Sequence, residues 1–277
     1  MRKLAIATTA IALLMTANAY AAAAPTADVE MEMMTWPELK KAIEGGKTTA
    51  IIYTGGTEQR GPQNVIGGHQ FMGKPLALDI ARKLGNAIMF PVLPYTPTGT
   101  SKEVPGGVNL PADVLGVVLE HLAEGAVANG FKNVVLMRDS GGGQGPTGVY
   151  AAAAKKVNDK HAAEGVKVVY ADQAYAVNNE FLKQIVAEGY PMSTHGGIPD
   201  TSLMLLLDKD GTLVRKDLLA TAVGDPVLPP GTKPDPNAKR INNGISGDGR
   251  RSSAALGKRL YDMKLNAAVA QIQTLLK

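Results

Sequence analysis

The sequence predicts an α/β fold: a single three-layer domain in which a mainly parallel sheet is flanked by helices. Short apolar runs of four to six residues alternate with longer segments whose apolar residues recur at helical spacing. This alternation favours a parallel sheet with helices on both faces. With 277 residues, the chain is long enough to build one hydrophobic core.

Helices are predicted from apolar spacing and from the residues that begin or end a helix. The first has Thr35 as its N-cap, Pro37 in its first turn and Gly45 at its end. A longer one begins at Pro111 and ends at Gly130. The predicted helices cover residues 36–46, 74–85, 111–130, 145–165, 174–189, 201–208 and about 252–276.

Strands are predicted at residues 49–54, 87–94, 133–138 and 167–171, where short apolar runs occur. In parallel sheets, ligands bind beyond the carboxyl ends of the strands. The segments that follow the first three strands should therefore form a site. Glu58 and Arg60 lie two residues apart just after the first strand. Positions i and i+2 of an extended chain point the same way, so both side chains should face that site.

The N-terminal residues are typical of a secretory signal peptide. Arg2 and Lys3 precede an apolar stretch at residues 4–19, which small residues follow. The apolar stretch is too short for a membrane-spanning helix. We divide the chain into a signal peptide at residues 1–24 and one domain at residues 25–277, and we expect a periplasmic or secreted protein. Because the chain has no cysteine, no disulfide stabilises this exported domain.

The charge distribution gives no support to nucleic-acid or membrane-surface binding. Removing Arg2 and Lys3 from the 29 basic residues leaves 27 against 25 acidic ones, and these charges are interspersed. Four Phe and one Trp provide no aromatic stacking platform. We expect a small-molecule substrate or ligand, with neither a nucleic acid nor a membrane as partner.

Five segments carry recognisable motifs in a fixed order. They are Thr-Trp-Pro-Glu with Thr-Glu-Gln-Arg-Gly-Pro at 35–62, Gly-Thr-Ser-Lys-Glu at 99–103, Arg-Asp-Ser-Gly-Gly-Gly at 138–143, His-Gly-Gly-Ile-Pro-Asp-Thr-Ser at 195–202, and Gly-Ile-Ser-Gly-Asp at 244–248. Together they resemble the creatininase (creatinine amidohydrolase) family across nearly the whole domain. The resemblance implies the creatininase fold, hydrolysis of carbon–nitrogen bonds and a homo-oligomer. It also leads us to expect Glu103 as a substrate-binding residue.

The family's functional residues carry over only in part. The family holds a pair of divalent metals with Glu and His of a Glu-x-His motif, an Asp eleven residues after that Glu, a later His and a later acid. At these positions this chain has Glu58, Arg60, His69, Ser140 and Asp200, respectively. The family's proton-carrying histidine corresponds to His195. Of these six positions, Glu58 and His195 alone are unchanged.

Arg60 argues against the two-metal centre. A guanidinium is always protonated and has no lone pair for a metal. At ~4 Å from a dication, with an effective dielectric of ~20, the repulsion is roughly 8 kcal/mol. Arg60 could instead pair with Glu58 or bind a substrate carboxylate.

Two alternatives remain for the metal. Glu58, His69 and Asp200 resemble a set suited to a single zinc, manganese or iron ion. Otherwise no metal binds, Glu58 and Asp200 hold Arg60 and nearby backbone amides, and His69 is a polar histidine on a glycine-flanked loop.

Three functions are compatible with these residues. The first is an amidohydrolase of small amides or cyclic amides with a rebuilt centre of at most one metal, in which Glu58 and His195 are catalytic. The second is a periplasmic family member that binds a small anionic ligand through Arg60 without catalysis. The third is a serine-type hydrolase in which Ser140 is the nucleophile, His195 the base and the following glycine amides bind an oxyanion. Alternatively, Asp139 and Ser140 only fix a turn.

Overall fold

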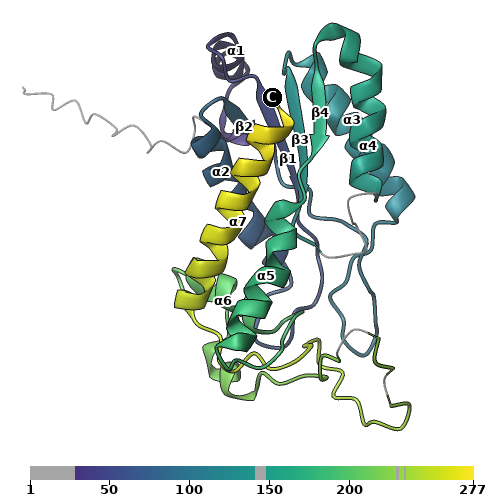
Figure 1. Cartoon of the computed structure of the whole chain (residues 1–277), viewed down its shortest axis with the longest axis vertical. Coiled ribbons are helices and arrows are strands. Elements are labelled where there is room, and N and C mark those ends of the chain that lie inside the picture. The colour runs from purple at the N-terminus through teal and green to yellow at the C-terminus, as the bar shows by residue number, and fades with distance from the viewer. Residues whose placement is uncertain (1–28, 141–147, 229–230, 234) are drawn as a thin grey trace, which may run out of the picture.

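The computed structural model describes residues 29–140, 148–228, 231–233 and 235–277, so the predicted signal peptide lies outside the described residues. Its sheet has four parallel strands in the order β2-β1-β3-β4 (Figure 1). The strands are β1 (Thr49–Thr54), β2 (Ala87–Met89), β3 (Asn133–Arg138) and β4 (Lys167–Tyr170). Helices cover both faces, which confirms the predicted fold class.

Seven α-helices occur in the described residues. They are α1 (Trp36–Glu44), α2 (Gly68–Leu84), α3 (Ala112–Ala128), α4 (Val149–His161), α5 (Gln173–Ala187), α6 (Ile198–Leu207) and α7 (Ala254–Leu275). Three short 3-10 helices accompany them, η1 (Met31–Met33), η2 (Ala162–Glu164) and η3 (Lys216–Thr221). Each predicted helix is present, and Thr35 is the N-cap of α1 as predicted, where it forms a capping box with Glu38.

Several elements differ from their predicted bounds, among them helix α4, which covers Val149–His161 within the predicted 145–165. Strand β2 is shorter than residues 87–94, because Pro91 has no N–H with which to continue the ladder. Helix α2 begins at Gly68, so His69 lies in a helical first turn and not on a glycine-flanked loop. Helix α6 begins at Ile198 with Pro199 in its first turn, which places Asp200 there as well.

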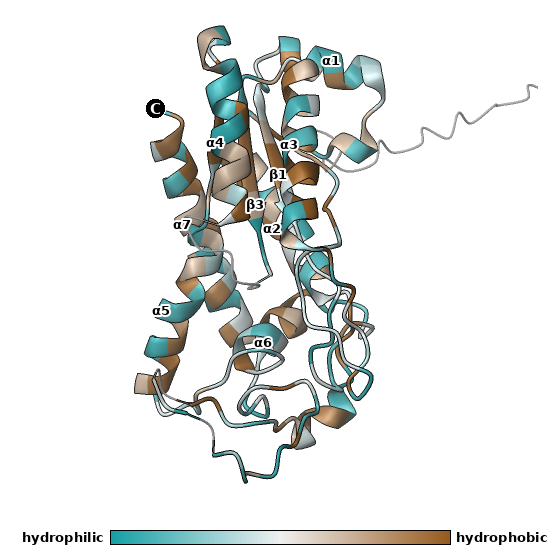
Figure 2. Cartoon of the chain, turned by 90° about the vertical axis from the view of Figure 1, so that its right-hand side faces the viewer, coloured by the Kyte–Doolittle hydropathy of each residue, from teal (hydrophilic) through white to brown (hydrophobic). Residues whose placement is uncertain are grey.

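The core has one layer on each side of the sheet. Along β1, Ile51 and Tyr53 pack with α2, α5, α6 and α7, whereas Ala50 and Ile52 pack with α3 and α4. This division follows from the period of two along a strand. Figure 2 shows the hydrophobic colouring of β1 and β3 between these helices. Among the described residues, we find no helix with the length and apolarity needed to cross a membrane.

The strand order places a crevice at the carboxyl ends of β1 and β3. Helix α2 follows β1 on one face, and α4 follows β3 on the other. The chain therefore departs in opposite directions from two neighbouring strands, a point where α/β sheets bind ligands. Helix α7 closes one side by packing tightly on α6. A Cβ atom on Gly257 would lie 2.0 Å from the Ser202 carbonyl oxygen, so glycine is needed there.

Candidate functional site

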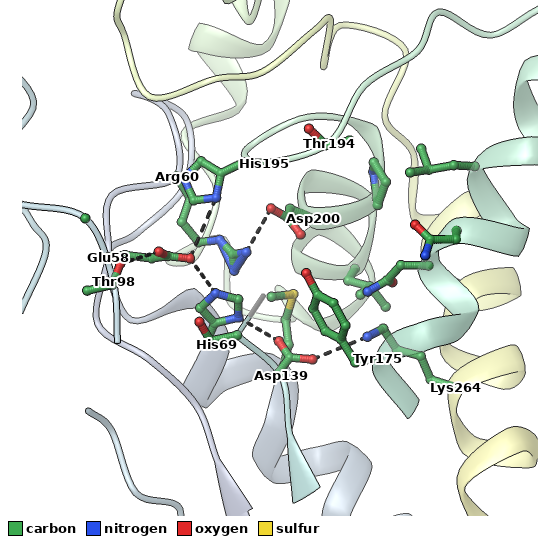
Figure 3. Close-up of a pocket in the computed structure, with 18 of the residues that line it drawn as sticks. Glu58, Arg60, His69, Thr98, Asp139, Tyr175, Thr194, His195, Asp200 and Lys264 are labelled. Atoms are coloured by element: carbon green, nitrogen blue, oxygen red, sulfur yellow. Dashed lines mark hydrogen bonds and ion pairs between the residues drawn. The ribbon is translucent and has the colours of Figure 1, made fainter. Parts of the chain in front are cut away.

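A cavity of about 390 Å³ lies beyond the carboxyl ends of the strands (Figure 3). Six of the seven predicted site residues line it: Glu58, Arg60, His69, Ser140, His195 and Asp200. Glu103 does not line it. Its side chain is exposed, and its carboxylate accepts a hydrogen bond from Asn242. The structure thus brings the predicted constellation together, with Glu103 outside it.

Glu58 stands on the loop after β1 and has both carboxylate oxygens engaged in hydrogen bonds. Its Oε1 accepts a hydrogen bond from His69 Nε2 at 2.6 Å, and its Oε2 accepts one from the Thr98 hydroxyl. Burial alone would raise the pKa of Glu58, but the His69 hydrogen bond and the charges of His69, His195 and Arg60 lower it to about 2. Glu58 is therefore a carboxylate at neutral pH.

His69 is held between two carboxylates. Its Nε2 faces Glu58, and its Nδ1 lies 2.8 Å from Asp139 Oδ2. An ionised carboxylate only accepts hydrogen bonds, so both ring nitrogens must donate. Burial and the Arg60 charge oppose protonation, but the hydrogen bonds to Asp139 and Glu58 outweigh them and raise the pKa of His69. The ring is thus a buried cation with both nitrogens engaged.

Asp139 follows β3 directly and connects His69 to helix α7. Its Oδ1 accepts a hydrogen bond from the buried Lys264 Nζ at 3.3 Å, and Lys264 also donates to the Ala174 carbonyl at 3.0 Å. Burial alone would raise the pKa of Asp139, but the Lys264 charge and the His69 hydrogen bond hold it well below its usual range. A row of charged groups therefore runs from Glu58 through His69 and Asp139 to Lys264.

Arg60 is 2% exposed and pairs with Asp200. Its Nη2 donates to Asp200 Oδ2 at 2.8 Å, and the same oxygen accepts the Gly196 N–H at 2.8 Å. These contacts agree with the alternative in which Asp200 holds Arg60 and a backbone amide, because the first turn of α6 presents Asp200 to both. Within the described part of the chain, the Nε and Nη1 atoms of Arg60 have no hydrogen-bond partner.

Two glycines let Arg60 take this position. A Cβ atom on Gly68 would lie 2.7 Å from Arg60 Cδ, so the start of α2 leaves room for the side chain. Gly61 has φ +76° and turns the chain directly after Arg60. The guanidinium is therefore held by the fold and not merely by its ionic partner.

His195 has one ring nitrogen fixed and the other facing the cavity. Its Nε2 donates to the Gln59 carbonyl oxygen, 2.6 Å away, which assigns the proton of the neutral ring to Nε2. Its Nδ1 lies 3.7 Å from Glu58 Oε1 (Figure 3). The geometry leaves Nδ1 free to accept a proton next to a carboxylate that would stabilise the resulting charge.

Ser140 lies at the cavity wall without the arrangement of a serine nucleophile. Its carbonyl accepts a hydrogen bond from Arg138 Nη1. Among the described residues, no hydrogen bond joins Ser140 to His195. The glycines predicted to bind an oxyanion, at 141–143, lie outside the described residues.

Sequence reasoning did not identify three further residues of the cavity. Asp139 had been considered only as a turn residue, and Lys264 and Tyr175 had no assigned role. A signal for Lys264 does exist, because it lies on a buried stripe of α7 with apolar residues at 256, 260, 268 and 272. Tyr175 lies under two cations, with Arg138 Cζ 4.3 Å and Lys264 Nζ 5.7 Å from its ring centroid. Burial raises the pKa of Tyr175 to about 12, so its hydroxyl stays protonated.

Solved structures similar to this one are creatininases. A structure described as "Creatininase Mn" has a TM-score of 0.71 and 19% identity, covering 89% of this chain and 98% of its own. A mutant creatininase of "Zn-Zn type" has a TM-score of 0.70 and 18% identity, covering 88% and 97%. A putative creatinine amidohydrolase from Bacteroides fragilis has a TM-score of 0.66 and 14% identity, covering 90% and 97%. At these identities, the likeness shows the fold alone.

The sequence itself provides the stronger comparison. A search of curated proteins found no match. In contrast, the family model for creatininase, described as creatinine amidohydrolase, matches residues 32–272. This match includes every strand and all the cavity-lining residues discussed above. By sequence and by fold, the chain belongs to the creatininase family.

Proposed function

We propose that this protein hydrolyses a carbon–nitrogen bond in a small amide or cyclic amide, with His195 as the group that carries the proton. The observation behind this proposal is the fixed orientation of His195, with Nε2 bonded to the Gln59 carbonyl and Nδ1 next to Glu58 in the cavity. Membership in a family of amidohydrolases supports the reaction class. Glu58 and His195 are also the two family positions that this chain retains.

The cavity residues suggest how such a reaction would proceed. His195 Nδ1 takes a proton from a water molecule, whose oxygen then attacks the amide carbonyl carbon. The Glu58 carboxylate stabilises the imidazolium that forms. The positive charge of the buried Arg60 stabilises the negative charge that develops on the carbonyl oxygen. When the carbon–nitrogen bond breaks, His195 returns the proton to the leaving nitrogen.

The residues of this chain do not fit the metals named in the descriptions of the similar structures. Glu58 Oε1 and His69 Nε2 are joined by a direct hydrogen bond of 2.6 Å, whereas an ion between them would need ~2.1 Å on each side. Asp200, the third predicted ligand, is bonded to Arg60 and to the Gly196 amide. In the part of the chain that the structure describes, no group of three or more His, Cys, Asp and Glu side chains is arranged to hold a metal ion.

Turnover of small amides tests the proposal. Purified protein, both as isolated and after dialysis against a chelator, is assayed with linear amides, lactams and cyclic amidines such as creatinine. We expect hydrolysis of at least one class, reduced about 100-fold or more in His195→Gln because the proton carrier is lost. His161→Gln, which changes a histidine of α4 that does not line the cavity, is the control. No turnover of any class by the unmodified protein, or full activity in His195→Gln, would contradict the proposal.

Ligand binding without turnover is the alternative that a specific observation favours. The charged groups Glu58, His69, Asp139 and Lys264 are fully engaged with one another, as expected of a rigid binding cavity. In that case, some of the same compounds would raise the thermal unfolding midpoint of the protein but remain intact. The serine-hydrolase alternative predicts covalent labelling of Ser140 by a fluorophosphonate probe.

We also propose export and self-association for this protein. The pattern at residues 1–24 supports export to the periplasm or secretion, and N-terminal sequencing of the exported form tests it. The resemblance to the family supports a homo-oligomer, which sedimentation at micromolar concentration tests.

A further inference from the structure

We infer that side-chain cations take the place of divalent ions in this cavity. Arg60, Lys264 and the His69 ring, which is hydrogen-bonded through both nitrogens, neutralise the carboxylates of the cavity and prevent metal binding. This inference rests on the family membership and on the contacts in the cavity. It does not depend on the proposed hydrolysis.

The first argument is that each carboxylate of the cavity already has a partner from the same chain. Asp200 is bonded to Arg60 at 2.8 Å, and Asp139 to Lys264 at 3.3 Å. The His69 ring contacts the remaining carboxylate, Glu58, at 2.6 Å and is a second partner of Asp139 at 2.8 Å. Carboxylate oxygens are the natural ligands of a divalent ion in such a site. Here an ion would first have to displace a buried side-chain cation.

The second argument is that these cations cannot easily leave. Arg60 and Lys264 are each 2% exposed, and His69 is 3% exposed. A buried charge that loses its partner pays a large desolvation cost, so the ion pairs persist. An exposed lysine or arginine could swing into solvent to admit an ion, whereas these three side chains are almost fully buried.

The third argument is that the backbone is shaped for the cations. Gly68 leaves the space that Arg60 occupies, because a Cβ atom there would lie 2.7 Å from Arg60 Cδ. Lys264 takes a central position on the buried stripe of α7, where its neighbours at 256, 260, 268 and 272 are apolar. Tyr175 contacts the Lys264 ammonium through its ring. The start of α2, the buried stripe of α7 and the Tyr175 ring thus all accommodate positive charge in this cavity. Two of the similar structures, by contrast, have zinc or manganese in their descriptions.

The test is to titrate the cavity with metals directly. The exported protein, purified without chelator, is analysed for bound metals and is then titrated calorimetrically with Zn²⁺ and Mn²⁺. The double variant Arg60→His/Lys264→Met removes two cations and restores one imidazole. Its matched control is Arg250→His/Lys258→Met, which changes two paired cations on the surface.

We expect substoichiometric metal in the unmodified protein and at least tenfold tighter Zn²⁺ binding in the Arg60→His/Lys264→Met variant than in the unmodified or control protein. One or more tightly bound ions per unmodified chain would overturn the inference, as would equal Zn²⁺ affinity in the variant and the control. Should the double variant not fold, as judged by circular dichroism, Arg60→His alone is titrated with the same criterion.

Activity assays separate this inference from the proposed function. A protein that hydrolyses amides only with bound metal would refute the inference and leave hydrolysis standing. A protein that is free of metal and hydrolyses nothing would support the inference and refute the hydrolysis.

Discussion

Replacing Glu58 by Gln should lower the free energy of unfolding at neutral pH, and the loss should disappear in acid. The substitution keeps the shape of the side chain and an oxygen that accepts the His69 hydrogen bond, but it removes the charge. The Glu58 side chain is 16% exposed, so solvent screens its interactions only in part. The effect of the charge should therefore be measurable as a free energy of unfolding.

The magnitude follows from the pKa of Glu58. Its value of about 2 in the folded protein lies below the ordinary 4.5. Because the folded pKa is depressed, the stabilisation is fully present above pH ~4.5 and is lost as the pH falls towards 2. The difference corresponds to about 3 kcal/mol at pH 7. Of this, roughly 2 kcal/mol should be lost by pH 3.

The assay is urea denaturation of the unmodified protein and Glu58→Gln at several pH values from 7 down to 3. We expect the two free energies of unfolding to differ by about 3 kcal/mol at pH 7 and to converge on acidification. Glu44→Gln, at a side chain that is 66% exposed, is the control and should show little dependence. A gap between the two proteins that stays constant from pH 7 to pH 3 would refute the reasoning.

Three further predictions concern His69, Lys264 and the contact between α6 and α7. Because the pKa of His69 is raised, its stabilisation is present below pH 6.5 and is lost as the pH rises through the folded pKa. The gap in unfolding free energy between the unmodified protein and His69→Gln should thus narrow from pH 6 to 9, and a widening gap would contradict this. Lys264→Met leaves the buried Asp139 with one cation fewer and should cost about 3 kcal/mol in urea denaturation, so an unchanged midpoint would count against the ion pair. Gly257→Ala should lower the free energy of unfolding by more than about 2 kcal/mol, because its methyl group would meet the α6 backbone. The loss should be visible as a lower thermal unfolding midpoint. Gly125→Ala in α3, where a Cβ has open space, should instead be neutral or stabilising.

The elements of this fold could be predicted from the sequence because their signals are local. Strand β1 reads as an apolar run, and α1 carries a capping box within its first four residues. Such patterns depend on neighbours within one or two turns, so a single sequence contains them. The bounds were less certain at β2 and α2, where tertiary packing decided how far each element extends.

The composition of the cavity could also be predicted in large part. Glu58 and Arg60 share an extended segment after β1, and the carboxyl ends of parallel strands meet at one edge. The resemblance to a family then placed His69, Ser140, His195 and Asp200 nearby. Glu103 lies outside the cavity, and its predicted role in substrate binding stays a prediction.

The partners within the cavity were decided by the tertiary structure alone. Arg60 pairs with Asp200 across 140 positions of sequence, and Lys264 reaches Asp139 across 125. Which charges meet depends on separations of a few ångströms and on burial, and both arise only when α6 and α7 pack against the sheet. The sequence by itself determined that carboxylates and an arginine would gather at this edge, since strand ends and the residue types that follow them are local properties. Only the packed structure determined that they neutralise one another, because an ion pair is a property of distance and not of sequence.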